Sequence, residues 1–196
     1  MKCLSIALAL LTIAASAQAE DRRSAVFAGG CFWCVEADFD RLDGVLETTS
    51  GFAGGTIPNP SYREVVGGGT GHREVVEIVY DAEIVDFAVL AEYLLRTTDP
   101  TDAGGQFCDR GFSYSTAIYA QDAEQLALAT EVVSRLSPEL DAPIVTEIVE
   151  GGTFYPAEEY HQDYYVKNPL RYRFYRGRCG RDAQVERVWG SHAAKS

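Results

Sequence analysis

The feature that most constrains the fold is a short apolar segment that ends in two glycines and a cysteine. Residues 24–28 are apolar and suited to a strand, Gly29 and Gly30 follow, and a helical pattern runs from 31 to 42. In that pattern Phe32, Val35 and Phe39 recur at the spacing that lines one face of a helix. A strand joined to a helix by a glycine turn predicts an α/β chain.

The rest of the chain continues this alternation of strand and helix patterns. We predict strands at 46–52, 74–80, 114–119 and 144–149, helices at 85–97, 123–136 and 157–166, and a loop at 56–70. From about residue 170 the sequence is rich in Arg, Tyr and Gly without periodicity, which predicts an irregular C-terminal tail. The pattern therefore predicts a single domain over residues 20–196, with mixed strands and helices.

The N-terminal residues have the composition of a secretory signal peptide. A lysine at position 2 precedes an apolar run over 4–15, and Ala17-Gln18-Ala19 supplies small residues at a cleavage site. We predict a signal peptide over 1–19, secretion to the bacterial periplasm, and no membrane insertion after cleavage, because no second apolar span follows. The chain has 29 acidic against 17 basic residues, a balance that disfavours binding to nucleic acid.

Four cysteines remain once the predicted signal peptide is removed: Cys31, Cys34, Cys108 and Cys179. In an oxidising compartment four cysteines suggest two disulfides, for which three pairings exist. The Cys-x-x-Cys spacing of Cys31 and Cys34 is also typical of reactive pairs. A zinc site would need a second such pair or paired histidines, and the sequence has neither. These comparisons favour a catalytic thiol over a staple or a metal site.

Cys31 is the expected nucleophile because it opens a helix. The free N–H groups and the positive end of the helix dipole favour thiolate, so we expect the pKa of Cys31 to be depressed. Phe32 and Trp33 follow it directly, and they either wall an apolar pocket for the substrate or pack into the core.

Several sequence blocks, in order, resemble the A-type peptide methionine sulfoxide reductases. They are the run GCFW at 30–33 with Glu36, then SGFAGG at 50–55, PNPSYREV at 58–65, TGHRE at 70–74, DRG at 109–111, STAIY at 115–119 and EYHQ at 159–162. The resemblance spans roughly residues 25 to 169. It implies an α+β two-layer fold with a mixed sheet, flanking helices and a ferredoxin-like core.

The resemblance also implies a role for each matching residue. Cys31 would attack the sulfur of methionine-S-sulfoxide, and Glu74 would protonate the departing oxygen. Tyr62 and Tyr114 would hold that oxygen through their hydroxyls, and Asp109 would support the substrate and the site network. A carboxylic acid acting near neutral pH needs a raised pKa, which an apolar surrounding provides.

The reaction that the resemblance implies needs no metal, flavin or nicotinamide. Cys31 becomes a sulfenic acid, a resolving thiol forms a disulfide with it, and thioredoxin or an exported thioredoxin-like dithiol reduces that disulfide. The substrates would be oxidised proteins or peptides, or the free amino acid. Phe32 and Trp33 would then form the pocket for the substrate methyl group. His72 and His161 fall in matching blocks, where we expect structural hydrogen bonding. We expect a monomer.

The cysteines depart from the family pattern. Cys34 stands where the family usually has glycine, Cys108 where asparagine usually precedes the aspartate, and Cys179 is single where some members have a pair. We rank the resolving thiols Cys34, then Cys179, then Cys108, the last of which would pair with Cys34 or fill space.

Two other functions remain open on the sequence. A periplasmic thioredoxin-like oxidoreductase would explain the Cys-x-x-Cys pair, but its tryptophan is expected before the first cysteine. A non-catalytic binding domain would use the cysteines only as disulfide staples.

Overall fold

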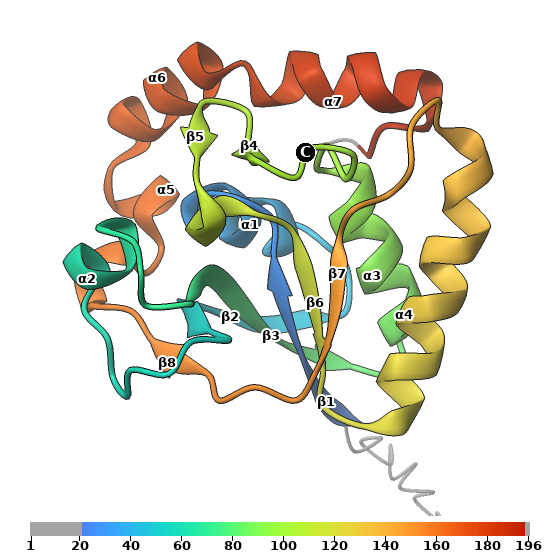
Figure 1. Cartoon of the computed structure of the whole chain (residues 1–196), viewed down its shortest axis with the longest axis horizontal. Helices are drawn as coiled ribbons and strands as arrows, with labels where there is room; N and C mark the ends of the chain where they lie inside the picture. The colour runs from blue at the N-terminus through green and yellow to red at the C-terminus, as the bar shows by residue number, and fades with distance from the viewer. Residues whose placement is uncertain (1–20, 195–196) are drawn as a thin grey trace, which may run out of the picture.

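The computed structural model describes residues 21–194, and the predicted signal peptide lies outside the described residues. A six-stranded sheet forms its centre, in the order β7-β6-β1-β3-β2-β8 (Figure 1). The strands are β1 Arg22–Ala28, β2 Val45–Ala53, β3 Arg73–Asp81, β6 Ala117–Ala120, β7 Glu147–Glu150 and β8 Tyr155–Pro156. Neighbours pair antiparallel except β6 and β7, which are parallel. The predicted mixed sheet with flanking helices is thus confirmed.

The helices are α1 Phe32–Phe39, α2 Tyr62–Val66, α3 Phe87–Arg96, α4 Ala123–Leu136, α5 Tyr164–Lys167, α6 Pro169–Cys179 and α7 Arg181–Trp189. A small hairpin of β4 Gly105–Gln106 and β5 Asp109–Arg110 lies beneath α6 and α7, which run across the top of Figure 1. Short 3-10 turns cover Phe112–Tyr114, Ser137–Glu139, Glu159–His161 and Gly190–His192. No helix within residues 21–194 is long and apolar enough to cross a membrane.

Both faces of the central strands are buried, which explains their nearly continuous apolar sequence. On β1, Phe27 packs with α1 and α3 residues in the main core, whereas Val26 belongs to a smaller cluster on the opposite face. On β3, Val76 and Val75 divide between the same two clusters. Since side chains alternate across a strand, a sheet covered on both faces selects apolar residues at successive positions.

Helix starts follow from local chemistry. The side chain of Asp86 accepts a hydrogen bond from Val89 N at 2.8 Å, and Asp122 accepts one from Gln125 N at the same distance. These caps satisfy backbone donors that the first helical turn leaves free. The predicted helix at 123–136 matches α4, but the predicted helix at 157–166 is wrong. A 3-10 turn and the four-residue α5 occupy that region instead.

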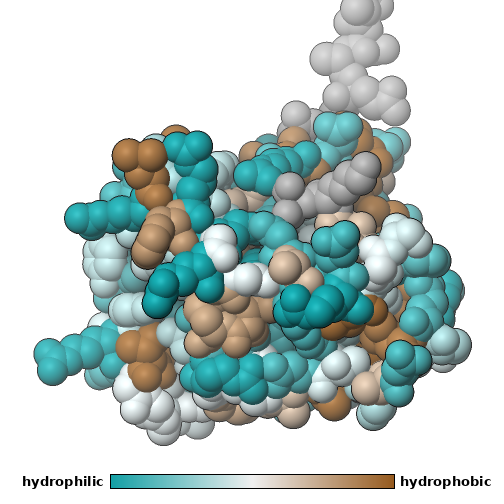
Figure 2. Space-filling view, turned by 90° about the horizontal axis from the view of Figure 1, so that it is seen from above, coloured by the Kyte–Doolittle hydropathy of each residue, from teal (hydrophilic) through white to brown (hydrophobic). Residues whose placement is uncertain are grey.

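The predicted irregular tail is also wrong, because residues beyond 168 form α6 and α7. In α6 the inward residue is the tyrosine Tyr172, while Leu170 and Phe174 point outward with 74% and 71% of their surface exposed. Figure 2 shows this face from above, with hydrophobic side chains standing between hydrophilic ones. The usual hydropathy pattern is therefore inverted along α6, so periodicity analysis does not detect it.

Candidate active site

The turn between β1 and α1 places Cys31 at the N-cap of the helix. Gly30 has φ +86°, and an added Cβ would lie 2.6 Å from the Cβ of Gln106. A side chain at position 30 would thus be strained by both its backbone and its neighbour. The carbonyl of Cys31 accepts hydrogen bonds from Cys34 N and Val35 N, which begins α1. Cys31 is 7% exposed, so only a small part of it reaches solvent.

Glu74 lies against the first turn of α1. Its Oε2 accepts a hydrogen bond from the backbone N–H of Phe32 at 2.9 Å, and the residue is 1% exposed. Burial raises the pKa of Glu74 to about 8, with the charge of Asp109 adding to the rise and the Phe32 N–H opposing it. The carboxyl is therefore protonated at neutral pH, and it lies against Phe32, the residue that follows Cys31.

Two tyrosine hydroxyls complete this side of the site. Tyr62, at the start of α2, and Tyr114, in the 3-10 turn before β6, share a hydrogen bond, and Tyr114 also hydrogen-bonds to Glu74. Burial raises the pKa of Tyr62 to about 12 and raises that of Tyr114 as well. Both hydroxyls therefore remain protonated donors, as stabilisation of a departing oxygen requires.

Tyr175 of α6 is a site residue that the sequence analysis did not identify. Its hydroxyl donates to Asp109 Oδ2 and also lies within hydrogen-bond reach of Cys31, so its single proton can serve either partner, one at a time. Burial raises the pKa of Asp109, while the hydrogen bond from Tyr175 opposes that rise. The sequence analysis predicted an irregular tail here, and only a helix over 169–179 brings the Tyr175 side chain back to the turn between β1 and α1.

Phe32 and Trp33 have different surroundings. Phe32 is buried against the rings of Tyr62 and His161. Trp33 is half-buried, stacks on Tyr164 with centroids 3.8 Å apart, and donates its Nε1–H to His161 Nδ1 at 3.0 Å. Both rings nevertheless contact the ring of His161, with centroid distances of 4.9 Å for Phe32 and 5.7 Å for Trp33.

Both histidines make structural hydrogen bonds, as the sequence analysis expected. His72 accepts a hydrogen bond from Gly55 N at 3.1 Å and donates from Nε2 to Ile57 O at 2.8 Å. Burial lowers the pKa of His161, which fits a neutral ring that accepts from Trp33. Each ring holds together two segments that are distant in sequence.

The expected depression of the Cys31 pKa is wrong. Burial raises the pKa of Cys31 well above its usual value, and the neighbouring Cys34 and Glu74 raise it further. The helix donor that should have stabilised a Cys31 thiolate, the N–H of Phe32, is occupied by Glu74. In contrast the pKa of Cys34 is lowered, first by a hydrogen bond from Cys31. When the pair loses one proton, the charge therefore resides on Cys34.

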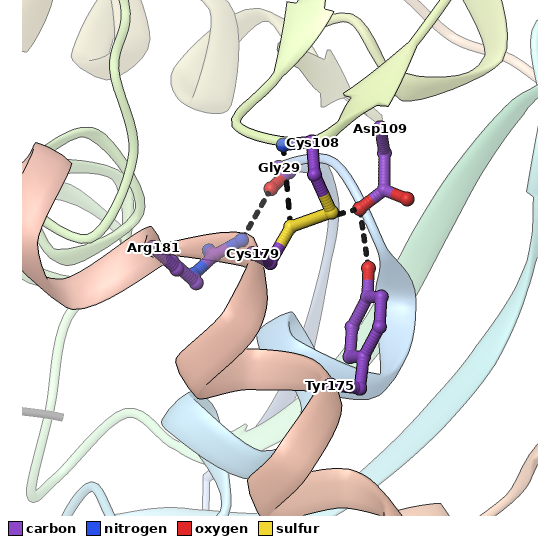
Figure 3. The surroundings of a disulfide bond; sticks show 6 residues. All are labelled: Gly29, Cys108, Asp109, Tyr175, Cys179 and Arg181. Carbon is purple, nitrogen blue, oxygen red and sulfur yellow. Dashed lines mark hydrogen bonds between the residues drawn. A yellow bond between two sulfur atoms is a disulfide. The ribbon is translucent and has the colours of Figure 1, made fainter.

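Cys108 and Cys179 form a disulfide (Figure 3). Cys31 and Cys34 are free thiols. This pairing corrects the expectation that Cys108 pairs with Cys34 or merely fills space. The disulfide fixes the end of α6 to the β4–β5 turn, and Asp109 Oδ2 lies 3.8 Å from Cys179 Sγ. A disulfide sulfur carries no proton, so this is a contact and not a hydrogen bond.

The described residues offer little to a metal ion. One group of potential ligands, Cys108, Asp109 and Cys179, has its ligand atoms within 4.8 Å of one another. Two of the three are consumed by the disulfide and cannot act as thiolate ligands. The site instead combines a protonated carboxyl at Glu74, the phenol donors of Tyr62 and Tyr114, and the two free thiols of Cys31 and Cys34.

Comparison with known proteins agrees with this chemistry. A family described as "Peptide methionine sulfoxide reductase" matches residues 23–193. MsrA 2 of Rhizobium meliloti is 51% identical over 177 residues, covering 90% of this chain and 88% of the relative. MsrA 2 of Caulobacter vibrioides is 45% identical over 188 residues, covering 94% of both chains.

Solved structures give the same result. Methionine sulfoxide reductase A of Corynebacterium diphtheriae superposes with a TM-score of 0.73 at 38% identity, covering 76% of each chain. Mxr1 of Saccharomyces cerevisiae in its reduced form gives a TM-score of 0.71 at 30% identity, covering 76% of this chain and 86% of the yeast protein.

Proposed function

Because the chain belongs to the peptide methionine sulfoxide reductase family, we propose that it reduces methionine-S-sulfoxide with Cys31 as nucleophile and Glu74 as proton donor. The chain is an oxidoreductase, and reduction of methionine sulfoxide is its reaction. The observation that carries the residue assignment is the buried Glu74 carboxyl on the N–H of Phe32, with its pKa raised to about 8.

In the first step the Cys31 sulfur attacks the sulfoxide sulfur. The Cys31 proton passes along its hydrogen bond to Cys34, and Glu74 donates its proton to the sulfoxide oxygen. The attack forms a bond between the two sulfurs. The protonated oxygen then passes from the substrate sulfur to the Cys31 sulfur as the substrate S–O bond and the new S–S bond break, so methionine leaves with the S–S electron pair and Cys31 carries the oxygen as a sulfenic acid. Tyr62 and Tyr114 donate hydrogen bonds to the oxygen while negative charge develops on it.

In the second step Cys34 attacks the Cys31 sulfur. A Cys31–Cys34 disulfide forms, the S–OH bond breaks, and the oxygen leaves as water with the proton released from Cys34. Cys34 is favoured for this step because it is the free thiol that hydrogen-bonds to Cys31, while Cys179 and Cys108 are bonded to each other.

An external dithiol then restores the thiols. The reaction needs no prosthetic group, since two thiols supply the two electrons. We expect a thioredoxin-type protein to be this reductant. Cys108 is exposed whereas Cys31 and Cys34 are buried, so the reductant reaches the Cys108–Cys179 disulfide more readily than the inner pair. A chain of contacts runs from Cys179 through Asp109 and Tyr175 to Cys31, and it connects the outer disulfide to the inner pair.

A single-turnover assay tests the residue assignment. Reduced enzyme is mixed with one equivalent of a peptide containing methionine-S-sulfoxide, and methionine, sulfenic acid and disulfides are quantified by mass spectrometry. Cys31→Ser should form no methionine, whereas Cys34→Ser should form it once and retain a sulfenic acid. Full methionine formation by Cys31→Ser would exclude this mechanism.

The same experiment distinguishes the competing functions. A thioredoxin-like oxidoreductase would reduce insulin disulfides and leave the sulfoxide peptide unchanged, and a binding domain would do neither. A first disulfide between Cys31 and Cys179 would overturn the assignment of Cys34 but leave the reductase activity in place.

We further propose that the protein works as a periplasmic monomer after removal of residues 1–19. The leader-like composition of those residues and a disulfide at an exposed position both support an oxidising compartment. Periplasmic protein should begin at residue 20 on N-terminal sequencing and elute with the light-scattering mass of one chain. Retention of residues 1–19 would contradict cleavage of a signal peptide. The mass of a dimer would contradict the monomer.

A further inference from the structure

The residue before Glu74 is a buried arginine on the opposite face of the sheet. Arg73 begins β3 and is 3% exposed. Side chains alternate between the two faces along a strand. Glu74 shares its face with Val76, which belongs to the main core. Arg73 shares the other face with Val75, which belongs to the smaller cluster. The two neighbours in sequence therefore contact groups on opposite sides of the sheet.

Arg73 contacts the 3-10 turn Phe112–Tyr114 that precedes β6. Its Nε donates a hydrogen bond to Ser115 Oγ at 2.7 Å, and the Ser115 hydroxyl donates to Phe112 O at 2.8 Å. The guanidinium carbon of Arg73 lies 4.2 Å from the centre of the Phe112 ring. The arginine therefore contacts the first residue of this turn and the residue that follows its last one.

Tyr114 extends from the same turn to the other side of β3. It directly precedes Ser115, and its hydroxyl hydrogen-bonds to Glu74. The turn thus lies across the beginning of β3, with the Phe112 ring against Arg73 on one face and the Tyr114 hydroxyl against Glu74 on the other. A shift of the turn away from Arg73 would move the Tyr114 hydroxyl relative to Glu74.

The turn has few hydrogen bonds of its own. Tyr114 N donates to Gly111 O at 3.1 Å, and Ser115 N donates to Phe112 O at 3.0 Å. Gly111 is the N-cap and has no side chain to accept a backbone donor, and Phe112 is 52% exposed. Because the hydrogen bonds of a 3-10 turn have poor geometry, its position depends on contacts with neighbouring elements.

Other partners fix the orientation of the Arg73 guanidinium. Nη2 lies 2.7 Å from Glu147 Oε2 of β7, and Nη1 donates to the Tyr119 hydroxyl at 3.3 Å. That hydroxyl donates in turn to Ala53 O at 3.2 Å. A guanidinium is planar and its donors point in fixed directions, so these contacts orient the group that Ser115 and the Phe112 ring meet.

We propose that Arg73 is a positioning residue that holds the Tyr114 hydroxyl beside Glu74 by anchoring the turn Phe112–Tyr114 from the opposite face of β3. This inference rests on the proposed role of Tyr114 as a donor to the departing oxygen. Such a donor is effective only if it is already in place when negative charge develops. Arg73 lies on the face of the sheet away from Glu74, so it acts only through the turn.

A double-mutant cycle tests the coupling between Arg73 and Tyr114. Wild type, Arg73→Gln, Tyr114→Phe and the double variant are compared by the maximal rate of methionine formation, at saturating peptide and without reductant, so that each enzyme turns over once. Arg73→Gln alone should slow this step by about tenfold or more, because a displaced donor loses much of its effect. In the Tyr114→Phe background the same change should slow it by less than about twofold.

The dependence of the rate on peptide concentration gives a second readout. Tyr114 is proposed to act on charge that develops in the transition state. Arg73→Gln should therefore lower the maximal rate and leave the half-saturating peptide concentration within about twofold of wild type. A rise in that concentration at an unchanged maximal rate would show that Arg73 affects substrate binding, and would overturn the proposal.

Glu147→Gln is a control on the same arginine. It removes the ion pair with Nη2 but leaves the contacts of Arg73 with Ser115 and Phe112 in place. Its rate of methionine formation should equal that of wild type. Slowing as large as in Arg73→Gln would assign the effect to the ion pair and refute anchoring of the turn.

Arg96→Gln is the matched control for stability. Arg96 is also largely buried, pairs with Glu92 at 2.6 Å and stacks over the Trp189 ring at 5.0 Å. Its loss should lower the temperature of unfolding and leave the rate of methionine formation at the wild-type value. If Arg96→Gln slows the reaction as much as Arg73→Gln, destabilisation explains the effect and the proposal fails.

Equal slowing by Arg73→Gln in both backgrounds would show that the arginine acts independently of Tyr114, and would overturn the proposal, as would a wild-type rate in Arg73→Gln. Should Arg73→Gln fail to fold, Ser115→Ala takes its place in the cycle, because it removes the Oγ that Arg73 binds and keeps the arginine. The same criteria then apply to it. A wild-type rate in Tyr114→Phe would refute the role of Tyr114 and this inference with it, while loss of methionine formation in Cys31→Ser would still report the reductase activity.

Discussion

Replacing Glu74 by glutamine tests whether this carboxyl is protonated in the folded protein. Glutamine keeps the size of the side chain and an oxygen that can accept from Phe32 N, but it cannot ionise. The pKa of Glu74 is about 8 in the folded protein against the ordinary glutamate value of 4.5. Because the folded-state pKa is the higher one, the stability that Glu74 contributes is fully present below pH 4.5 and is lost as pH rises through 8.

The expected size follows from these two pKa values. At pH 7 the unfolded chain has ionised Glu74 and the folded chain has not, which lowers the free energy of unfolding by about 3 kcal/mol. Glu74→Gln does not have this loss. The difference in unfolding free energy between variant and wild type should therefore shift by about 3 kcal/mol in favour of the variant between pH 4 and pH 7.

Urea unfolding of wild type and Glu74→Gln at pH 4 and pH 7 measures this difference. The other titratable groups are the same in both proteins, so their contributions to the pH dependence cancel. Glu64→Gln serves as a control of opposite sign, because the hydrogen bonds from Ser61 lower the pKa of Glu64. A double difference below about 1 kcal/mol for Glu74→Gln would show that Glu74 is already ionised at neutral pH and would refute its role as donor.

The same variant should also lose activity. General acid catalysis contributes about 10²- to 10⁴-fold, so methionine formation by Glu74→Gln should slow by about that factor. In wild type the rate should fall as pH rises through about 8, where the proton of Glu74 is lost. That decline should be absent from the residual activity of the variant.

Three further changes have defined outcomes. Cys179→Ser removes the Cys108–Cys179 disulfide, which joins residues 71 positions apart in the sequence. In denaturant titration this should lower the free energy of unfolding by about 4 kcal/mol, because the unfolded chain gains conformational entropy. A change near zero would contradict this reason. Tyr175→Phe removes a hydroxyl whose hydrogen bond lowers the pKa of Cys31, so alkylation of Cys31 should require higher pH, measured as the midpoint of its rate profile; an unchanged midpoint would refute that contact. Gly30→Ala introduces a Cβ 2.6 Å from a buried side-chain carbon at a φ of +86°, and should destabilise the protein by about 2 kcal/mol or more in thermal unfolding.

Local patterns predicted much of the fold. The glycine turn before Cys31 and the helix after it depend on residues within a few positions of each other, and so does α4 with its Asp122 cap. The order of strands in the sheet does not follow from such patterns. It depends on which distant segments pair, for example β2 with β8, and on the parallel contact of β6 with β7.

The proposed catalytic residues divide in the same way. The resemblance named Cys31, Glu74, Tyr62, Tyr114 and Asp109, and the structure brings them together around one turn. It gave no indication of Tyr175, which lies on α6, where Leu170 and Phe174 point outward and Tyr172 is buried. It also gave no indication of Arg181, a buried charged residue at the start of α7.

The sequence by itself determined that a cysteine opens a helix after a glycine turn, since backbone conformation there follows from the glycines. Only the tertiary structure decided the ionisation of that cysteine. Burial raises its pKa, and the neighbouring Cys34 and Glu74 raise it further. The pKa of Cys34 is lowered first by a hydrogen bond from Cys31 and then by the charges of Arg181 and Arg176. Groups that are distant in the sequence contact Cys31 in a site from which water is largely excluded. Their effect on its pKa is therefore larger than that of the helix N-terminus.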